Sequence, residues 1–258
     1  MTTLVCWTGC DSRGPSSLYI ATDSRYSWDR VKWSSGRKLA VRPQSGELLA
    51  FAGDCAFASS LFLALPEHPL SDGSILQRLT TTSNQYPWPL EKTVIVFARR
   101  LGEGMQSSFL VTAFEYGNGA WSQHPQKISR ESSGLVCAFG SGASHARQEV
   151  GRWIKGDVSG RTSRSVFSGF CSALEQGVDR DSGGAPQLAS LYRRGLAREC
   201  GLVWKGIRYV AGLPPDEGAD LWRWAWHNDL LERYDPYTME RLLGAQPHAS
   251  PFTARGTQ

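Results

Sequence analysis

Residues 1–9 read MTTLVCWTG, and the interpretation of the whole chain starts from this stretch. Threonine and valine favour β-strands, so the stretch predicts a strand that begins almost at the first residue. A second interpretation is chemical. If Met1 is removed, Thr2 carries a free α-amine beside its hydroxyl, and the two groups can act as base and nucleophile in acyl transfer. The rest of the sequence has to separate these two interpretations.

The composition is that of a globular protein. The chain has 258 residues, of which 41% are hydrophobic and 20% charged, and this length suits one large domain or two small ones. The formal net charge is only +4 and the basic residues are scattered, so we expect no nucleic-acid partner. No apolar run approaches the roughly 20 residues that cross a bilayer, and the start lacks a secretory signal. We therefore expect a cytoplasmic protein that does not bind membranes.

The cysteines and histidines do not form a recognisable metal site. The six cysteines include no CxxC pair and lie mostly among apolar neighbours, which favours buried free thiols over a disulfide or zinc framework. The five histidines are dispersed, and no phosphate-binding glycine loop is present. We expect neither a metal ion nor a cofactor.

Strand-like runs alternate with two pairs of helical segments. This order predicts antiparallel sheets packed together with helices outside, which is an α+β layered domain. Residues 10–17, CDSRGPSS, are expected to form a polar turn, and Asp54 is expected to cap the first helix. In chain order the strands are expected at 2–9, 18–24, 37–41, 47–53, 92–100, 108–115, 120–124, 134–142, 186–193 and 201–212, and the helices at 55–65, 73–84, 143–155 and 163–177.

The last part of the chain has a different character. Trp222, Trp224 and Trp226 occupy alternate positions, which one face of a strand can accommodate and one face of a helix cannot. They either pack on the domain's own core or form a subunit contact, because tryptophan is enriched in interfaces. We divide the chain into a main domain over 2–212 and an aromatic-rich extension over 213–258.

A threonine nucleophile needs a nearby cation, a carboxylate to hold that cation, and backbone N–H donors for the oxyanion. Asp23 follows a predicted strand in IATDSR, Lys38 begins another in GRKLAV, and Gly53 lies at a strand-to-helix junction in FAGD. The amino-terminal end of that helix would direct N–H groups and its dipole toward a developing negative charge. Taken singly, each of these residues is also typical of an ordinary turn or strand end.

In order along the chain, the motifs resemble those of the proteasome β-subunit and HslV family of N-terminal nucleophile (Ntn) hydrolases. The matching stretches are TT, IATDSR, GRKLA, FAGD, AFGSGASHA and DRDSGG, within residues 2–212. The resemblance implies a four-layer αββα sandwich of two antiparallel sheets flanked by helices, assembled into homo-oligomeric rings. The extension is atypical of that family and suggests a bacterial homologue, of the beta-proteobacterial kind.

The resemblance also implies a role for each matched residue. Two spacings agree with the family, 15 residues from Asp23 to Lys38 and 38 from Ser141 to Asp179. The 21 residues from Thr2 to Asp23 are more than the family shows, and the turn at 10–17 would absorb the surplus. The implied catalytic residues are Thr2 as nucleophile and base, Asp23 and Lys38 as an ion pair, Gly53 as oxyanion donor, and Ser141, Asp179 and Ser182 around the amine.

The same matching implies a substrate pocket. Tyr26, Phe51 and Cys55 would surround the side chain that precedes the scissile bond, and Phe51 would restrict it to small or medium apolar residues. Core packing accounts for the three residues equally simply.

Three functions follow. The first is a threonine endopeptidase that cleaves peptides or unfolded proteins inside a homo-oligomeric ring or double ring. The second is an Ntn amidohydrolase acting on a small amide, because a fold does not fix its substrate. The third, a non-catalytic ring scaffold, is disfavoured because such subunits lack the threonine and the lysine. The sequence does not indicate whether an ATPase unfoldase supplies substrates.

Overall fold

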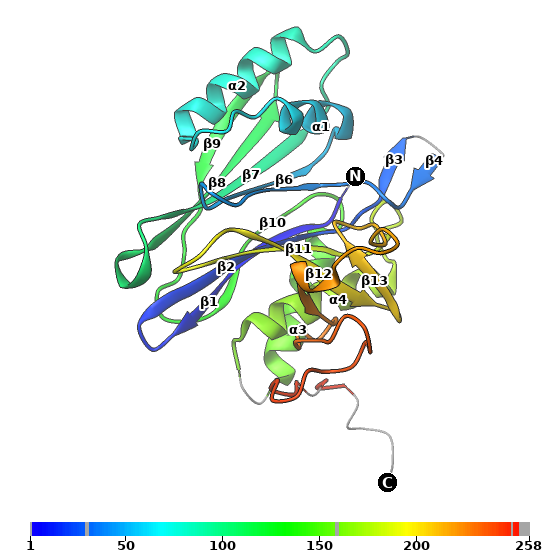
Figure 1. Cartoon of the computed structure of the whole chain (residues 1–258). Coiled ribbons are helices and arrows are strands. Elements are labelled where there is room, and N and C mark those ends of the chain that lie inside the picture. The colour runs from blue at the N-terminus through cyan, green and yellow to red at the C-terminus, as the bar shows by residue number, and fades with distance from the viewer. Residues whose placement is uncertain (1, 29–30, 158–159, 249, 253–258) are drawn as a thin grey trace.

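Two β-sheets pack against each other in the computed structural model of this chain (Figure 1). The structure describes residues 2–28, 31–157, 160–248 and 250–252. One sheet has seven strands, ordered β10-β1-β2-β11-β12-β13, with β14 pairing in parallel with β12. The other has five antiparallel strands in the order β5-β6-β7-β8-β9, and β3 and β4 form a separate hairpin. The fold is therefore of the α+β class that the sequence predicts.

The strands of the seven-stranded sheet are β1 (Leu4–Asp11), β2 (Gly14–Thr22), β10 (Gly134–Phe139), β11 (Gln187–Tyr192), β12 (Arg198–Trp204), β13 (Ile207–Val210) and β14 (Ala225–His227). Those of the five-stranded sheet are β5 (Leu39–Arg42), β6 (Glu47–Ala52), β7 (Thr93–Leu101), β8 (Ser108–Gly117) and β9 (Ala120–Pro125). The hairpin consists of β3 (Tyr26–Trp28) and β4 (Val31–Trp33). The helices are α1 (Cys55–Leu63), α2 (Asp72–Gln85), α3 (Ala143–Gly156) and α4 (Ser163–Gln176), with short 3-10 turns at Gly104–Gln106 and Leu221–Arg223.

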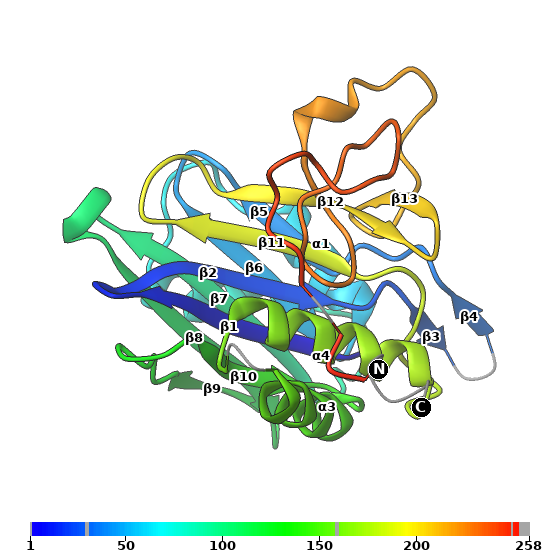
Figure 2. The same ribbon diagram turned by 90° about the horizontal axis from the view of Figure 1, so that it is seen from below.

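Three large apolar clusters hold the sheets and helices together, and a smaller one joins Val203 of β12 to Leu221 and Trp226. The first lies between the sheets and joins residues such as Leu4 and Ile20 to Leu48 and Val96. The second lies beneath α1 and α2 on the outer face of the five-stranded sheet. The third lies between the seven-stranded sheet and the helices α3 and α4, which Figure 2 views from their own side. The central strands of each sheet, such as β1, β6 and β7, are thus buried on both faces and are mostly apolar, whereas the edge strand β9 is exposed.

The four predicted helices are confirmed, and so is the cap of α1. The Asp54 carboxylate accepts a hydrogen bond from the Phe57 N–H at 3.0 Å, and this bond satisfies one of the free donors at the helix start. All six cysteines are free thiols, and five of them are buried. None of the described helices exceeds 14 residues, and none is long and apolar enough to cross a membrane.

The prediction of a polar turn over residues 10–17 is wrong. β1 and β2 stay paired from Leu4 and Thr22 to Asp11 and Gly14, so the turn consists of Ser12 and Arg13 alone. The pairing register shifts between Gly9 and Cys10, which is a β-bulge. Beyond this bulge the polar residues remain paired between β1 and β2. The additional residues therefore lengthen the hairpin, and its open end still brings Thr2 next to Asp23.

The three tryptophans at alternate positions do not lie on one strand. Trp222 lies in a 3-10 turn and is 55% exposed, whereas only Trp226 belongs to β14 and is 3% exposed. Gly201 of β12 makes room for the Trp226 ring, because a Cβ atom there would lie 2.4 Å from it. The C-terminal segment thus packs on its own domain through Trp226, and Trp222 remains on the surface.

Candidate active site

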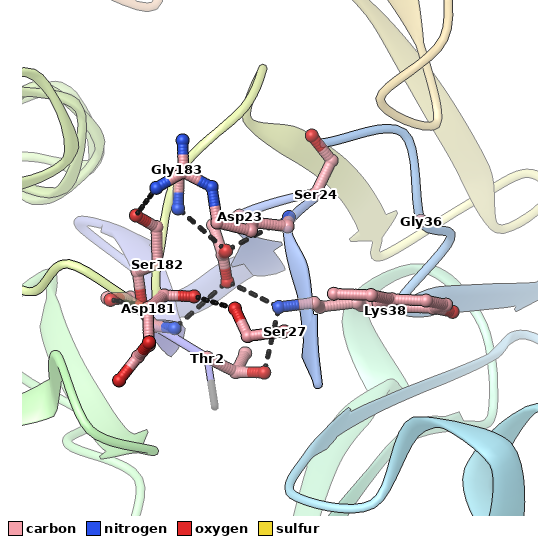
Figure 3. A network of polar contacts seen from close by, with 12 residues as sticks. Thr2, Asp23, Ser24, Ser27, Gly36, Lys38, Asp181, Ser182 and Gly183 are labelled. Atoms are coloured by element: carbon pink, nitrogen blue, oxygen red, sulfur yellow. Dashed lines mark hydrogen bonds and ion pairs between the residues drawn. The ribbon is translucent and has the colours of Figure 1, made fainter. Parts of the chain in front are cut away.

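Thr2, Asp23 and Lys38 meet at the open end of the β1–β2 hairpin, as Figure 3 shows. The Lys38 ammonium donates a hydrogen bond to Thr2 Oγ1 at 2.8 Å and pairs with Asp23 Oδ1 at 2.9 Å. All three residues are at most 1% exposed. The sequence predicted these three residues to act together, and the fold places their side chains in direct contact.

Burial affects the pKa of Lys38. Desolvation lowers the pKa of Lys38 below its ordinary value, although the neighbouring Asp23 carboxylate favours the charged form. The 2.8 Å contact requires Thr2 Oγ1 to accept from Lys38, so the hydroxyl proton is free to point elsewhere. A cation that close stabilises negative charge on the threonine oxygen.

Asp23 is held by four donors. Its Oδ1 accepts from Lys38 and from the Thr3 N–H at 3.0 Å, and its Oδ2 accepts from the N–H groups of Arg25 at 3.1 Å and Gly183 at 2.9 Å. Four donors on one carboxylate fix its orientation. Asp23 therefore acts as a rigid acceptor that aims Lys38 at Thr2.

A second polar group lies beside the first. Asp179 Oδ2 accepts from the Ser141 hydroxyl at 2.6 Å and from the Ser182 hydroxyl at 2.7 Å. Burial alone would raise the pKa of Asp179, but these hydrogen bonds and one from the Asp181 N–H lower it below its ordinary value. Ser141, Asp179 and Ser182 thus form one network, as the motif GSG and the motif DRDSGG predicted.

Thr3 joins the two groups, and the sequence analysis did not identify it. Its hydroxyl donates to Ser182 Oγ at 2.8 Å while its N–H donates to Asp23. The loop that carries Ser141 lies directly against Thr2 and Thr3. A Cβ atom at Gly140 would lie 1.9 Å from the Thr2 carbonyl oxygen, and one at Gly142 would lie 1.9 Å from Thr3 Oγ1, so this approach requires glycine.

Gln187 is a second residue that the sequence analysis missed. It lies at the start of β11 and is 1% exposed. Its Oε1 accepts from the Lys38 N–H at 3.0 Å, and its Nε2 donates to the Gly36 carbonyl at 2.6 Å. One amide therefore ties the seven-stranded sheet to the backbone that carries Lys38. A lone glutamine in PQLASLY has no sequence signal that distinguishes it from a surface residue.

Gly53 lies between β6 and α1, as predicted. Its φ of +130° is unfavourable for other residues, and a Cβ atom would lie 2.6 Å from the Lys92 carbonyl oxygen. The next N–H, that of Asp54, donates to Thr93 Oγ1 at 3.0 Å. No hydrogen bond between Gly53 and Thr2 is found within the described residues, so its role as oxyanion donor stays a prediction.

Tyr26, Phe51 and Cys55 lie in one apolar cluster under α1. Tyr26 contacts Phe51 at 6.1 Å between ring centroids, and the Lys38 ammonium lies 5.9 Å from the Tyr26 centroid. A cavity of about 520 Å³ adjoins Tyr26 and is lined mainly by apolar side chains, among them Trp33, Leu39 and Phe62. Phe51 and Cys55 are not among the residues that line it. Across the described part of the chain, no group of His, Cys, Asp and Glu side chains is arranged to hold a metal ion.

No family model and no curated protein matches this sequence. Among solved structures, Thiobacillus denitrificans BPH in complex with epoxomicin is similar, at 18% sequence identity and a TM-score of 0.46. The match covers 75% of this chain and 100% of that chain. BPH is a bacterial proteasome homologue.

Proposed function

We propose that this protein is a proteasome-like Ntn hydrolase that cleaves peptide bonds through an acyl-enzyme on Thr2. The contact between the buried Lys38 ammonium and Thr2 Oγ1 supports this proposal most directly. A threonine hydroxyl is a weak nucleophile at neutral pH and needs activation. The buried Lys38 cation, held in place by the Asp23 carboxylate, supplies it, because the positive charge lowers the free energy of the developing alkoxide.

The proposed reaction begins with removal of Met1, which converts the Thr2 amide nitrogen into an α-amine. This amine has an ordinary pKa of about 7.7 to 8.0 and can accept the hydroxyl proton near neutral pH. The Thr2 oxygen then forms a bond to the peptide carbonyl carbon. The peptide C–N bond breaks, and the leaving amine takes the proton. Water, deprotonated by the same α-amine, hydrolyses the ester and restores Thr2.

The other matched residues would support these steps. Lys38 would stabilise the negative charge on Thr2 Oγ1, and Asp23 would hold Lys38 in place. Ser141, Asp179 and Ser182 would orient the freed amine, since their network is linked to the strand of Thr2 through Thr3. The Gly53 N–H would bind the oxyanion with the help of the α1 dipole.

We propose the same architecture and assembly that the motifs imply. The two stacked sheets with helices on both outer faces would form the four-layer αββα sandwich of Ntn hydrolases. The subunits would assemble into a homo-oligomeric ring that encloses the cleavage sites and admits peptides or unfolded proteins. Tyr26, Phe51 and Cys55 would shape the pocket before the scissile bond.

Intact-mass spectrometry with a peptide epoxyketone tests this function. The reagent closes a ring only with a hydroxyl and a free amine on one N-terminal residue. We expect one adduct on a chain that lacks Met1. The Thr2→Ala variant, which lacks only the hydroxyl and methyl group, should give none.

The other outcomes separate the alternatives. A chain without Met1 that forms no adduct, but hydrolyses small amides, would favour the small-amide hydrolase. A chain that keeps Met1 and shows no turnover with peptides, proteins or amides would favour the ring scaffold. Either result would contradict the proposed peptidase.

A further inference from the structure

A second cavity lies beside β5 and β12, next to the C-terminal segment. Its volume is about 700 Å³. It is bounded by the start of β5, by β12 and by residues 222–226 and 233–234. Its lining includes the charged residues Arg37, Arg198, Glu199, Arg223 and Arg233 and the exposed Trp222.

The cavity carries a strong excess of positive charge. Four of these side chains are guanidinium groups, and Glu199 is the one carboxylate among the residues that line the cavity. Arg37 pairs with Glu199 at 2.8 Å, and this pair bridges the two sheets. Arg198, Arg223 and Arg233 form no ion pair with any residue that the structure describes. These three arginines give the lining of the cavity an excess of positive charge, which favours an anionic ligand.

Aromatic rings form the adjacent wall. Trp222 is 55% exposed, which is unusual for a side chain of its size. The Arg223 guanidinium lies 5.6 Å from the Trp224 ring centroid, a cation–π distance that limits its motion. Guanidinium groups that are already oriented lose less entropy when they bind a carboxylate.

We propose that this cavity binds an acidic segment of polypeptide. The ion pair between Arg37 and Glu199 already shows one guanidinium group of this cavity bound to a carboxylate. Further carboxylates would bind Arg198, Arg223 and Arg233 in the same way, and the exposed Trp222 would cover the aliphatic part of the segment.

The position of the cavity fits an extended ligand. It shares Arg37 and Val41 with the apolar cavity beside Tyr26, so the two cavities adjoin along the edge strand β5. Arg37 also directly precedes Lys38 in the chain. A polypeptide held here would lie next to the candidate active site, yet its binding does not require turnover at Thr2.

Fluorescence anisotropy of a labelled hexaglutamate peptide tests the proposal. The full chain is titrated as the Thr2→Ala variant, so that cleavage plays no part and failure of the proposed peptidase leaves the test intact. We expect saturable binding that weakens with ionic strength, and no binding of hexalysine. The variant Arg198→Gln/Arg223→Gln/Arg233→Gln should bind roughly tenfold more weakly.

The matched control is Lys92→Gln/Lys127→Gln/Lys155→Gln, which removes the same charge from exposed positions outside the cavity. It should change the affinity less than about twofold. The single variant Arg223→Glu provides the same test if the triple variant unfolds. Equal losses in both triple variants, or none in the cavity variant, would overturn the proposal. So would binding of tripolyphosphate without binding of hexaglutamate, because the site would then select phosphate.

Discussion

Asp23 accepts four hydrogen bonds, so a change at this single residue should affect the whole candidate site. In Asp23→Asn an amide N–H₂ group would face backbone N–H donors, and the Lys38 ammonium would lose its counter-charge. Removing one partner of a buried ion pair costs about 3–5 kcal/mol. We expect that loss in urea unfolding, together with loss of epoxyketone labelling. The exposed Asp216→Asn should alter neither, and an unchanged Asp23→Asn protein would contradict this account.

Asp179 gives a prediction about pH. Hydrogen bonds from Ser141 and Ser182 lower its pKa in the folded state, so the unfolded chain binds the proton more readily. The group therefore contributes stability above the ordinary carboxyl pKa, and this contribution disappears as the pH falls through the lowered value. We expect Ser141→Ala/Ser182→Ala to lose most stability at neutral pH. The difference from wild type in unfolding free energy should shrink as the solution is acidified, and a constant difference would show that Asp179 is not the cause.

Gln187 is a second residue at which one substitution should affect both the stability of the fold and the candidate site. Gln187→Leu removes the acceptor of the Lys38 N–H and the donor to the Gly36 carbonyl, and the loss of one such buried hydrogen-bond partner costs about 1–3 kcal/mol. The unfolding free energy should fall accordingly, and the rate of epoxyketone labelling of the folded protein should fall with it, because Lys38 loses its anchor. Gln123→Leu, on the exposed strand β9, is the control for the change in side chain.

At the scale of elements, the junction between β6 and α1 depends on glycine. Gly53→Ala would place a Cβ atom 2.6 Å from the Lys92 carbonyl oxygen at a φ of +130°. We expect a loss of about 1–3 kcal/mol or more in unfolding free energy. Gly73→Ala in α2 is the contrast, because the space there is open and alanine should stabilise the helix by about 0.5–1 kcal/mol. Equal effects of the two substitutions in thermal unfolding would refute the argument.

The elements also show what the sequence can reveal. Strands and helices were predictable where the apolar pattern is periodic and a cap such as Asp54 marks the start. The turn at 10–17 was not, because a bulge lets polar residues remain in a ladder. In the site, Asp23, Lys38, Ser141 and Asp179 belong to motifs. Thr3 and Gln187 do not, since their roles arise only from contacts between distant segments.

At the scale of the whole molecule, the tryptophans of the C-terminal segment should differ in their effect on stability. Trp226 fills the space above Gly201, so it should stabilise the domain itself. Trp226→Ala should therefore lower the unfolding free energy by about 3–5 kcal/mol. Trp222 is half exposed, and Trp222→Ala should leave stability within about 0.5 kcal/mol of wild type.

Light scattering measures the mass of the assembled protein and therefore tests the proposed ring. A ring of the proposed kind has a mass several times the 28.4 kDa of one chain. If exposed tryptophans such as Trp222 contact a neighbouring subunit, Trp222→Ala should reduce the assembled mass without unfolding the domain, because interface aromatics contribute much of the binding energy. A wild-type protein that stays at the mass of one chain would contradict the ring. If the assembled mass is unchanged in Trp222→Ala, other surfaces form the subunit contacts. Trp222 would then serve only the arginine-lined cavity.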